Sequence, residues 1–453
     1  MSDTIIAQAT PQGMGGVYIV RISGKKSSFV SKCILGKILK PRYAVYSKFF
    51  DLDKNIIDQG IGIWFPSPNS FTGEDVLELQ GHGNNFISNL LIKKILQIKG
   101  IRIADPGEFS KRAFLNKKLD LIQSESISDL INSTSEELVK ASLRSLNGDF
   151  SNYINKIIDK VTYLRSIVEA ELNFSDEDIN FNIEKKIFLN IRKIISSLKK
   201  VLFISKNSSI LNNGAKVVIA GFPNAGKSSL FNLLSCKKSS IVTNFKGTTR
   251  DLIHNKIIFN KQLIELTDTA GIRQTKDKIE KIGIKLAKNE INFSNILLFL
   301  IDSSKNKKKQ IQKFFKIIKN LSSEIHIILI LNKIDLININ PKIVFLKNIE
   351  LIFLSIKKKI GIEILYSCLR KKLNKLISIP KENIFLVRQR HIQEIKSTLK
   401  ELNNSQLDWK KNKNYEILAY YLKNSQNYLN KITGEVNTED ILNKIFSNFC
   451  IGK

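Results

Sequence analysis

The chain has 453 residues, 43% of them hydrophobic, and its 72 basic and 41 acidic residues give a formal net charge of +31. This length allows two to four domains with large cores, and four cysteines without paired metal-ligand spacing argue against a disulfide framework or a zinc site. The charge predicts a polyanionic partner such as RNA, unless a compositional drift toward Lys, Asn and Ile has raised it without a binding role.

The ends and the apolar runs of the chain indicate its compartment. The N-terminus lacks a basic stretch followed by an apolar one, so we expect no signal peptide. Apolar runs such as residues 296–301 have strand length and are too short to cross a bilayer. We therefore expect a cytoplasmic protein without a membrane association.

The first part of the chain changes character near residue 118. Residues 1–117 alternate short apolar stretches with Gly and Pro, which is typical of a small α+β domain. Residues 17–22 and 60–65 have the pattern of strands, and residues 86–98 that of a helix. From 118 to 213 long helical periodicity takes over, and one helix face carries Val161, Leu164, Ile167, Val168 and Leu172.

Strand-like and helix-like segments alternate from residue 214 to 375, and helical character returns from 376 to 453. This order predicts an α/β unit inserted into one discontinuous helical domain, because insertion is tolerated where the ends of the inserted unit lie close together. The run KNKKK at residues 305–309 predicts the solvated start of a surface helix. The expected fold class is α/β and α+β multidomain.

Residues 221–228, GFPNAGKS, fit the phosphate-binding loop pattern. The loop lies between an apolar run at 217–220 and a helix-like segment at 230–234, so backbone N–H groups can converge on phosphate oxygens. Lys227 is placed to meet the β- and γ-phosphates, and the Ser228 hydroxyl to ligate Mg²⁺.

A second nucleotide motif, DTAG at residues 268–271, follows a predicted strand at 263–267. Asp268 can hold Mg²⁺ through water, and the Gly271 N–H can sense a γ-phosphate.

Two further segments favour guanine. Residues 332–335, NKID, follow the apolar run 327–331, and the Asp335 carboxylate can accept the N1–H and the 2-amino hydrogens of guanine. A backbone N–H within residues 355–357, SIK, can reach guanine O6. Because each motif follows an apolar strand, the inserted domain is predicted to be a Ras-like P-loop GTPase domain.

Two residues bear on the mechanism of hydrolysis. Signalling GTPases orient the attacking water with a glutamine directly after the Asp-x-x-Gly motif, and here that position is Ile272, which cannot hydrogen-bond to water. Asn224 of the phosphate loop has an amide oxygen that could ligate a monovalent cation near the phosphates. Such a cation could neutralise transition-state charge.

These motifs, with others outside the GTPase domain, resemble the MnmE (TrmE) tRNA-modification GTPase family over essentially the whole chain. The GTPase-domain matches are residues 221–228, 247–251, 268–271 and 282–284. The outer matches are far more specific, and they are AQATP at 7–11, FTGEDVLELQGHG at 71–83, PGEFS at 106–110, AFLN at 113–116, ITGE at 432–435 and FCIGK at 449–453. Phe222 and Ile356 depart from the family pattern, but the backbone N–H groups of both loops are retained.

The resemblance implies four parts. They are an N-terminal tetrahydrofolate-binding and dimerisation domain at 1–117, a helical domain at 118–213, the GTPase domain at 214–375, and a second helical part with the C-terminal tail at 376–453. The implied GTP-binding residues are Asn224, Ala225, Gly226, Lys227, Ser228, Ser229, Thr243, Asn244, Phe245, Lys246, Gly247, Thr248, Thr249, Asp268, Thr269, Ala270, Gly271, Asn332, Lys333, Asp335, Ser355, Ile356 and Lys357.

The resemblance also implies metal ions and a residue that positions water. Ser228 and Thr249 would ligate Mg²⁺, and hydrolysis would occur when two GTPase domains meet across K⁺-containing sites. Glu280 would position the hydrolytic water indirectly, although the sequence alone favours an ordinary exposed carboxylate. The implied K⁺ ligands are Asn224, Thr243, Phe245 and Thr248.

In the N-terminal domain the resemblance implies a site for a tetrahydrofolate derivative, 5,10-methylene- or 5-formyl-tetrahydrofolate. Its implied contacts are Arg21, Glu78, Lys118 and the C-terminal Lys453. From the sequence alone each is more simply a surface charge. Cys450 would lie near the modification chemistry, with a small buried apolar residue as the alternative. His82 has no companion ligands, so we expect a structural role for it.

The implied reaction adds an aminomethyl-type group to C5 of the tRNA wobble uridine. The flavin would come from a partner protein of the MnmG family, since this chain has no Rossmann glycine fingerprint, and a homodimer would join that partner in a heterotetramer. A ribosome-assembly GTPase is one alternative, disfavoured because residues 380–453 lack a Gly-x-x-Gly loop. A folate-dependent one-carbon enzyme that the GTPase merely regulates is another.

Overall fold

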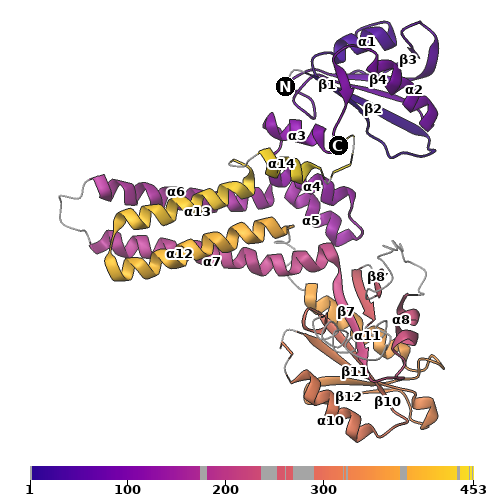
Figure 1. Cartoon of the computed structure of the whole chain (residues 1–453), viewed down its shortest axis with the longest axis vertical. Coiled ribbons are helices and arrows are strands. Elements are labelled where there is room, and N and C mark those ends of the chain that lie inside the picture. The colour runs from indigo at the N-terminus through magenta and orange to yellow at the C-terminus, as the bar shows by residue number, and fades with distance from the viewer. Residues whose placement is uncertain are drawn as a thin grey trace, which may run out of the picture. The chain divides into compact units, whose positions relative to one another are not determined.

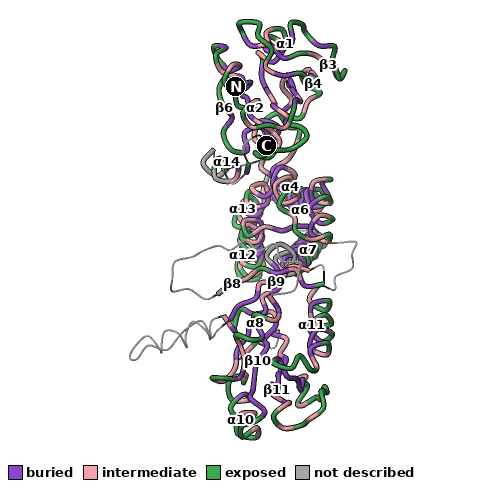
Figure 2. The backbone as a smooth tube through the Cα atoms, turned by 90° about the vertical axis from the view of Figure 1, so that its right-hand side faces the viewer, coloured by how far each residue is buried: buried purple, intermediate pink, exposed green. Residues whose placement is uncertain are grey.

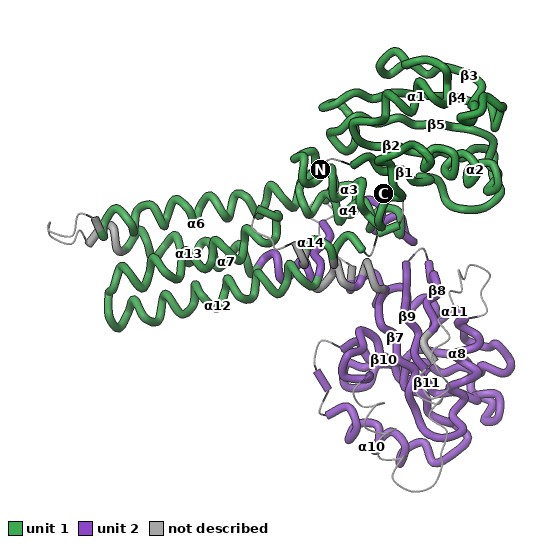
Figure 3. Tube along the Cα trace, turned by 45° about the horizontal axis from the view of Figure 1, so that its top comes forward, with its two compact units in different colours: residues 1–132, 142–199, 389–453 green, residues 133–141, 200–388 purple. Residues whose placement is uncertain are grey.

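The computed structural model describes residues 3–173, 181–235, 253–260, 262–268, 290–319, 321–322, 325–377, 385–435, 439–447, 449–450 and 452. Its helices and strands are labelled in Figure 1. The chain forms two compact units (Figure 3). Unit 1 contains residues 1–132, 142–199 and 389–453, and unit 2 contains residues 133–141 and 200–388.

Unit 1 begins with a six-stranded sheet of order β3-β4-β5-β2-β1-β6, antiparallel except where β1 pairs with β6. Alternate residues of β2, Tyr18, Val20 and Ile22, are buried in one core with residues of α1 and α2 such as Val30 and Leu91. The elements are β1 (Thr4–Gln8), β2 (Val17–Ser23), α1 (Ser27–Leu35), β3 (Val45–Phe50), β4 (Ile56–Phe65), β5 (Val76–His82), α2 (Asn85–Leu96), β6 (Ile101–Ile103) and α3 (Glu108–Leu115).

The rest of unit 1 is helical, and its long helices α6 and α13 pack against each other, as do α12 and α13 (Figure 1). None of the described helices is both long and apolar enough to cross a membrane. The helices are α4 (Leu121–Ile131), α5 (Glu136–Leu146), α6 (Asp149–Asn173), α7 (Phe181–Asn213), α12 (Gln389–Asn412), α13 (Tyr415–Thr433) and α14 (Glu439–Phe446). Of these, α5 begins in unit 2 and α7 ends in it.

Unit 2 is built on a seven-stranded sheet of order β12-β13-β11-β10-β7-β9-β8, in which β12 and β8 run antiparallel to their neighbours and the others are parallel. Its central strands β10 and β11 are buried (Figure 2), which explains their continuous apolar sequences. The elements are β7 (Ala215–Gly221), α8 (Lys227–Ser235), β8 (Ile253–Phe259), β9 (Gln262–Asp268), β10 (Ile296–Asp302), α10 (Lys307–Ile318), β11 (His326–Asn332), the 3-10 helix η2 (Ile334–Leu336), β12 (Lys342–Leu346), β13 (Ile349–Phe353) and α11 (Ile362–Ile377).

Both faces of this sheet are covered. Ile328 and Ile330 of β11 share one core with residues of α8 and α11, whereas Leu329 and Leu331 share the other with Phe314 of α10. The predicted fold class, an α+β region, helical sequence and a P-loop α/β unit, is therefore confirmed.

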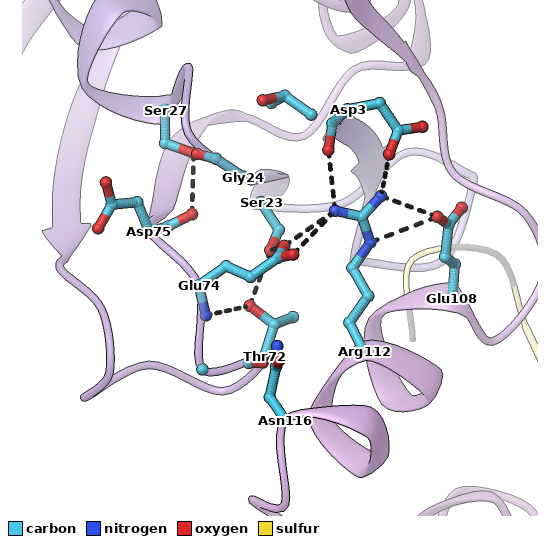
Figure 4. A network of polar contacts seen from close by, with 12 residues as sticks. Asp3, Ser23, Gly24, Ser27, Thr72, Glu74, Asp75, Glu108, Arg112 and Asn116 are labelled. Atoms are coloured by element: carbon cyan, nitrogen blue, oxygen red, sulfur yellow. Dashed lines mark hydrogen bonds and ion pairs between the residues drawn. The ribbon is translucent and has the colours of Figure 1, made fainter. Parts of the chain in front are cut away.

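A buried arginine joins three segments of the N-terminal region. Arg112 of α3 is 1% exposed, and its guanidinium donates hydrogen bonds to the carboxylates of Asp3, Glu74 and Glu108 at 2.9–3.1 Å (Figure 4). Burial alone would raise the pKa of Glu108, but hydrogen bonds from Arg102 and Arg112 outweigh it and the pKa lies below its usual value. Each buried charge in this network is thus paired, as burial requires.

A second buried ion cluster ties the start of α12 to α4 and α13. Both carboxylate oxygens of Glu125 accept hydrogen bonds from Arg390, at 2.8 and 2.9 Å, and His391 Nε2 lies 3.1 Å from Glu125 Oε2. The same guanidinium donates to the carbonyls of Lys431 and Ile432 at the end of α13. Although burial opposes ionisation, the charge of Arg390 and the hydrogen bond with His391 hold the pKa of Glu125 well below its usual value.

We predict that Glu125→Gln lowers the free energy of unfolding of the helical region by about 3 kcal/mol or more at neutral pH, because it leaves Arg390 without its buried counter-charge. The folded pKa of Glu125 lies below the unfolded one, so its contribution is present above pH ~4.5 and is lost as the pH falls further. The variant should therefore lose less stability on acidification than the parent.

The measurement is urea unfolding by tryptophan fluorescence in a Trp64→Phe background, which leaves Trp409 of α12 as the reporter. Glu435→Gln, at an exposed residue just after α13, is the matched control. Equal unfolding midpoints for the two variants would show that the cluster does not stabilise the fold.

Candidate guanine-nucleotide site

The loop between β7 and α8 requires glycine at two positions. Gly221 has φ +149°, and a Cβ there would lie 2.3 Å from Leu300 O. Gly226 has φ +102°, and a Cβ there would lie 2.4 Å from Asn332 Nδ2. Any side chain would therefore force the loop away from β10 and β11, so the glycines of the motif are explained by the packing of the loop.

Lys227 begins α8 and folds back over the loop. Its Nζ donates hydrogen bonds to the carbonyls of Gly221 and Phe222, at 3.2 and 3.1 Å. Burial lowers the pKa of Lys227, and the nearby charge of Asp268 opposes that shift only in part. Asp268, the last residue of β9, pairs in the sheet with Ile219 of β7. The ammonium and the carboxylate therefore share one end of the sheet, where a phosphate-bound metal ion would need them.

Asn332, the last residue of β11, links two loops. Its Nδ2 donates to Ala225 O in the phosphate loop at 2.8 Å, and its Oδ1 accepts from the backbone N–H of Ile356 at 3.0 Å. Asn332 is 4% exposed, so both bonds are protected from water. The next residue, Lys333, donates to Asp302 at 2.6 Å. One amide thus fixes the spacing between the phosphate loop and the predicted guanine loop.

A cavity of about 630 Å³ lies between these loops, lined by residues that include Gly226, Asn332, Asp335 and Ser355. Asp335 Oδ1 is buried and has no hydrogen-bond partner within the described part of the chain. A buried acceptor without a partner costs free energy, which a ligand with N–H donors would recover. The cavity is therefore suited to a ring that presents adjacent donors, as guanine does.

The described site residues divide into those at this cavity and those elsewhere. Gly226, Ser229, Asn332, Lys333, Asp335, Ser355, Ile356 and Lys357 line the cavity, and Ala225, Lys227 and Asp268 lie beside it. Asn224 and Ser228 are exposed in the phosphate loop and at the start of α8. The cavity also contains three residues that the sequence motifs missed, Asn232, Leu233 and Leu336, of which Leu336 directly follows the NKID motif.

The remaining predicted residues lie outside the described part of the chain. They are Thr243, Asn244, Phe245, Lys246, Gly247, Thr248, Thr249, Thr269, Ala270, Gly271, Glu280 and Lys453, together with Ile272.

The predicted folate residues lie in unit 1. Arg21 and Glu78 face each other in the register of β2 and β5, and Arg21 Nε donates to Glu78 Oε1 at 2.8 Å. The Arg21 guanidinium also lies 5.5 and 5.8 Å from the ring centroids of Phe71 and Phe109. The pair is only 20% and 16% exposed, so neither residue is an ordinary surface charge. Lys118 is exposed in the segment between α3 and α4.

The C-terminal segment lies against the same sheet. A Cβ on Gly452 would lie 2.3 Å from Gln8 O, and Gln8 adjoins Ala7, which pairs with Arg21. Cys450 is exposed, so the alternative of a small buried apolar residue is wrong for this cysteine. His82 Nδ1 lies 2.7 Å from Asp58 Oδ1.

Two family models match the chain. The model of the GTP-binding protein TrmE N-terminus matches residues 4–118, and that of the MnmE helical domain matches residues 121–450. The tRNA modification GTPase MnmE of Actinobacillus pleuropneumoniae serotype 5b is 46% identical over 454 residues, which is 100% of each chain. This chain belongs to the MnmE (TrmE) family.

Other relatives give the same result. MnmE of Buchnera aphidicola subsp. Schizaphis graminum is 46% identical over 457 residues, covering 100% of this chain and 99% of the relative. Among solved structures, the G domain of the Thermotoga maritima FeoB iron transporter is 22% identical and covers 36% of this chain and 98% of its own, with a TM-score of 0.26. That score is too low to support a conclusion. Membership of the MnmE family rests on the full-length relatives and the family models.

We predict that Asn332→Ala lowers the free energy of unfolding of unit 2 by about 2 kcal/mol or more, because it leaves Ala225 O and the Ile356 N–H without their partner. GTP affinity should fall at least tenfold, since the two loops lose their fixed spacing. Thermal unfolding and titration with a fluorescent GTP analogue measure these effects. Asn306→Ala, which removes only the N-terminal cap of α10, is the control for affinity, and equal GTP affinities in the two variants would contradict the prediction.

Proposed function

We propose that this MnmE-family GTPase uses GTP hydrolysis to support the modification of C5 of the tRNA wobble uridine. The observation that carries the guanine-nucleotide part of the proposal is Asp335 Oδ1, which is buried without a hydrogen-bond partner among the described residues and lies in a cavity that begins at the phosphate loop. Family membership makes the chain a GTP hydrolase of tRNA modification. The atom modified, the one-carbon donor and the partner protein are the proposed additions.

The proposed hydrolysis uses residues at one end of the unit 2 sheet. The N–H groups of the phosphate loop and Lys227 would bind the β- and γ-phosphates, and Asp335 would hold the base. Ser228 and Thr249 would supply oxygen ligands of the kind that Mg²⁺ prefers, and Asp268 would hold the ion through water. Lys227 exchanges its two carbonyl acceptors for phosphate oxygens in this proposal, and its lowered pKa reflects burial that a phosphate charge would offset.

Ile272 cannot orient water, so the proposal assigns charge neutralisation to K⁺ and water positioning to Glu280. Asn224 supports this assignment because it has φ +61° and is exposed in the loop, where its amide is accessible to an ion. The other proposed K⁺ ligands are Thr243, Phe245 and Thr248.

GTP turnover is therefore expected to be at least roughly tenfold faster in KCl than in NaCl of equal concentration, because a bound cation neutralises transition-state charge. Glu280→Ala should lower turnover about a hundredfold and leave binding of a fluorescent GDP analogue unchanged. Glu363→Ala, at an exposed carboxylate in the first turn of α11, is the control. Equal rates in the two salts would rule out the cation mechanism.

The proposed one-carbon donor is a tetrahydrofolate derivative bound in the N-terminal region. Arg21 can pair with the carboxylates of the folate glutamate, and Glu78 can accept from pterin N–H groups. The partly buried Arg21–Glu78 pair and the nearby exposed ring of Phe71 support this role, since a pterin ring packs well on aromatic surfaces. Lys118, Lys453 and the exposed Cys450 complete the proposed set.

The proposed partners are a second copy of the chain and a flavin-binding protein of the MnmG family. Reconstitution with that protein, tRNA and 5,10-methylene-tetrahydrofolate labelled with ¹³C should place the label on the wobble uridine, as read by mass spectrometry of the nucleosides. Arg21→Ala should reduce the label at least tenfold and leave GTP turnover unchanged, whereas Lys48→Ala, at an exposed residue of β3, should change neither. If the wobble uridine remains unlabelled and unmodified after reconstitution with the wild-type chain, the proposed role in modification is wrong.

A further inference from the structure

One surface of unit 2 carries positive charge that no described carboxylate balances. Residues 303–323 contain seven lysines and no acidic residue. They include α10, whose first turn has no acidic side chain. Two further lysines are Lys342, which begins strand β12, and Lys347, which directly follows it. We call this the α10 lysine surface, and it consists of Lys305, Lys307, Lys308, Lys309, Lys313, Lys316, Lys319, Lys342 and Lys347.

Helix geometry places three of these lysines on one exposed face. Lys309, Lys313 and Lys316 follow the i, i+4, i+7 spacing of a single face, and all three are exposed. The opposite face of α10 packs into the core through Phe314, which is fully buried. The three ammonium groups are therefore presented outward together.

Three more lysines are held by aromatic rings. Lys307 and Lys342 both lie over the ring of Phe353, at 4.4 and 5.5 Å from its centroid, and Lys347 lies 5.1 Å from the ring of Phe315. Burial and the charge of Lys342 lower the pKa of Lys307, as expected when two like charges are held close together. The fold thus gathers cations from α10 and β12 at one place.

Compositional drift alone does not explain this arrangement. Elsewhere in the described chain some cations are neutralised locally, as in Lys140–Glu136, Arg165–Glu169 and Lys372–Glu350. Other described lysines without an ion pair, such as those of α12, alternate with acidic residues along their own helix, whereas residues 303–323 contain none. Within the described residues, by contrast, none of the nine lysines of the α10 surface forms an ion pair with a carboxylate. An uncompensated positive surface of this kind attracts a polyanion.

We propose that the α10 lysine surface binds the phosphate backbone of RNA. The choice of RNA rests on the proposed role in tRNA modification, while the surface itself rests on its charge. An acidic membrane fits less well, because an interfacial helix needs a broad exposed apolar face. On α10 Ile317 is the one exposed large apolar side chain, whereas Ile311, Phe314 and Phe315 pack into the core. Lysine contacts to phosphates would add affinity and orientation without reading sequence.

The test compares two triple variants of the full-length protein. In the first, Lys309, Lys313 and Lys316 are changed to Gln, and in the second Lys396, Lys400 and Lys411, exposed lysines of α12, are changed to Gln. Each variant loses three positive charges, so the net charge is matched. Binding of an unmodified tRNA transcript is measured by fluorescence anisotropy as the salt concentration rises from about 50 to 200 mM.

The α10 variant should bind the tRNA at least tenfold more weakly at low salt, and its slope of log affinity against log salt should be smaller by about 2. The α12 variant should keep the wild-type slope. GTP turnover should be unchanged in both variants, because these lysines lie outside the nucleotide site. The GTP turnover measurement therefore tests the GTPase assignment independently of the tRNA-binding measurement, which tests the α10 lysine surface.

Folding is controlled by the thermal midpoint. Lys309 lies in the first turn of α10 and Lys316 in the last, where the helix dipole has opposite effects on a cation, so removing both with Lys313 should leave the midpoint nearly unchanged. A midpoint close to that of the wild type then shows that weaker binding does not come from unfolding. If both variants lose the same tRNA affinity, the loss comes from the change in net charge and not from the α10 lysine surface, and the proposal is wrong. Binding to phosphatidylglycerol vesicles that the α10 variant loses, with tRNA affinity unchanged, would assign the surface to a membrane instead.

Discussion

The candidate site depends on one buried amide, that of Asn332. Its two hydrogen bonds connect the loop after β7 with the loop after β13, while its own strand β11 lies between β10 and β13 in the sheet. The contact leaves no room for a side chain at Gly226, so the glycine and the asparagine require each other. Because the amide donates on one side and accepts on the other, neither Asp nor a hydrophobic residue could replace it.

Charged and polar groups in the described part of this chain fall into two kinds, those that have a partner of opposite charge or a hydrogen-bond donor within the fold and those that do not. Arg112 and Glu125 are buried and fully engaged by opposite charges, so they stabilise the fold and have no capacity left for a ligand. The Asp335 carboxylate oxygen and the α10 lysine surface are the reverse case, since among the described residues they lack the opposite charge or donor that their position requires. An unmet electrostatic requirement that persists in a folded protein is best explained by a ligand that meets it.

The sequence was sufficient where function is local. Residues 221–228 and 332–335 could be recognised because a phosphate loop and a base-reading aspartate need particular residues at fixed spacing, and the strands before them were predicted from their apolar runs. The sequence was not sufficient where function depends on register. The Asn332 contact with Ala225 spans 107 residues, and the Glu125 contact with Arg390 spans 265. Likewise, nothing in the run at 305–309 indicates that β12 brings Lys342 to the ring that Lys307 covers.

The chain crosses between the units four times, and the crossings at residues 199/200 and 388/389, which bound the long segment of unit 2, are built differently. The first is continuous helix, because α7 passes residue 199, where unit 1 ends, without a break. At the second, a new helix begins: Gln389, the first residue of the chain back in unit 1, is also the first residue of α12. The next residue, Arg390, is held by hydrogen bonds to Glu125 and to two carbonyls of α13. A returning chain anchored within its second residue cannot fray into the helical region, so the ion cluster sets a fixed end point for the inserted unit. The burial of the Glu125 carboxylate, held by Arg390 and His391, is therefore explained by the need to hold one position, which apolar packing alone would specify less sharply.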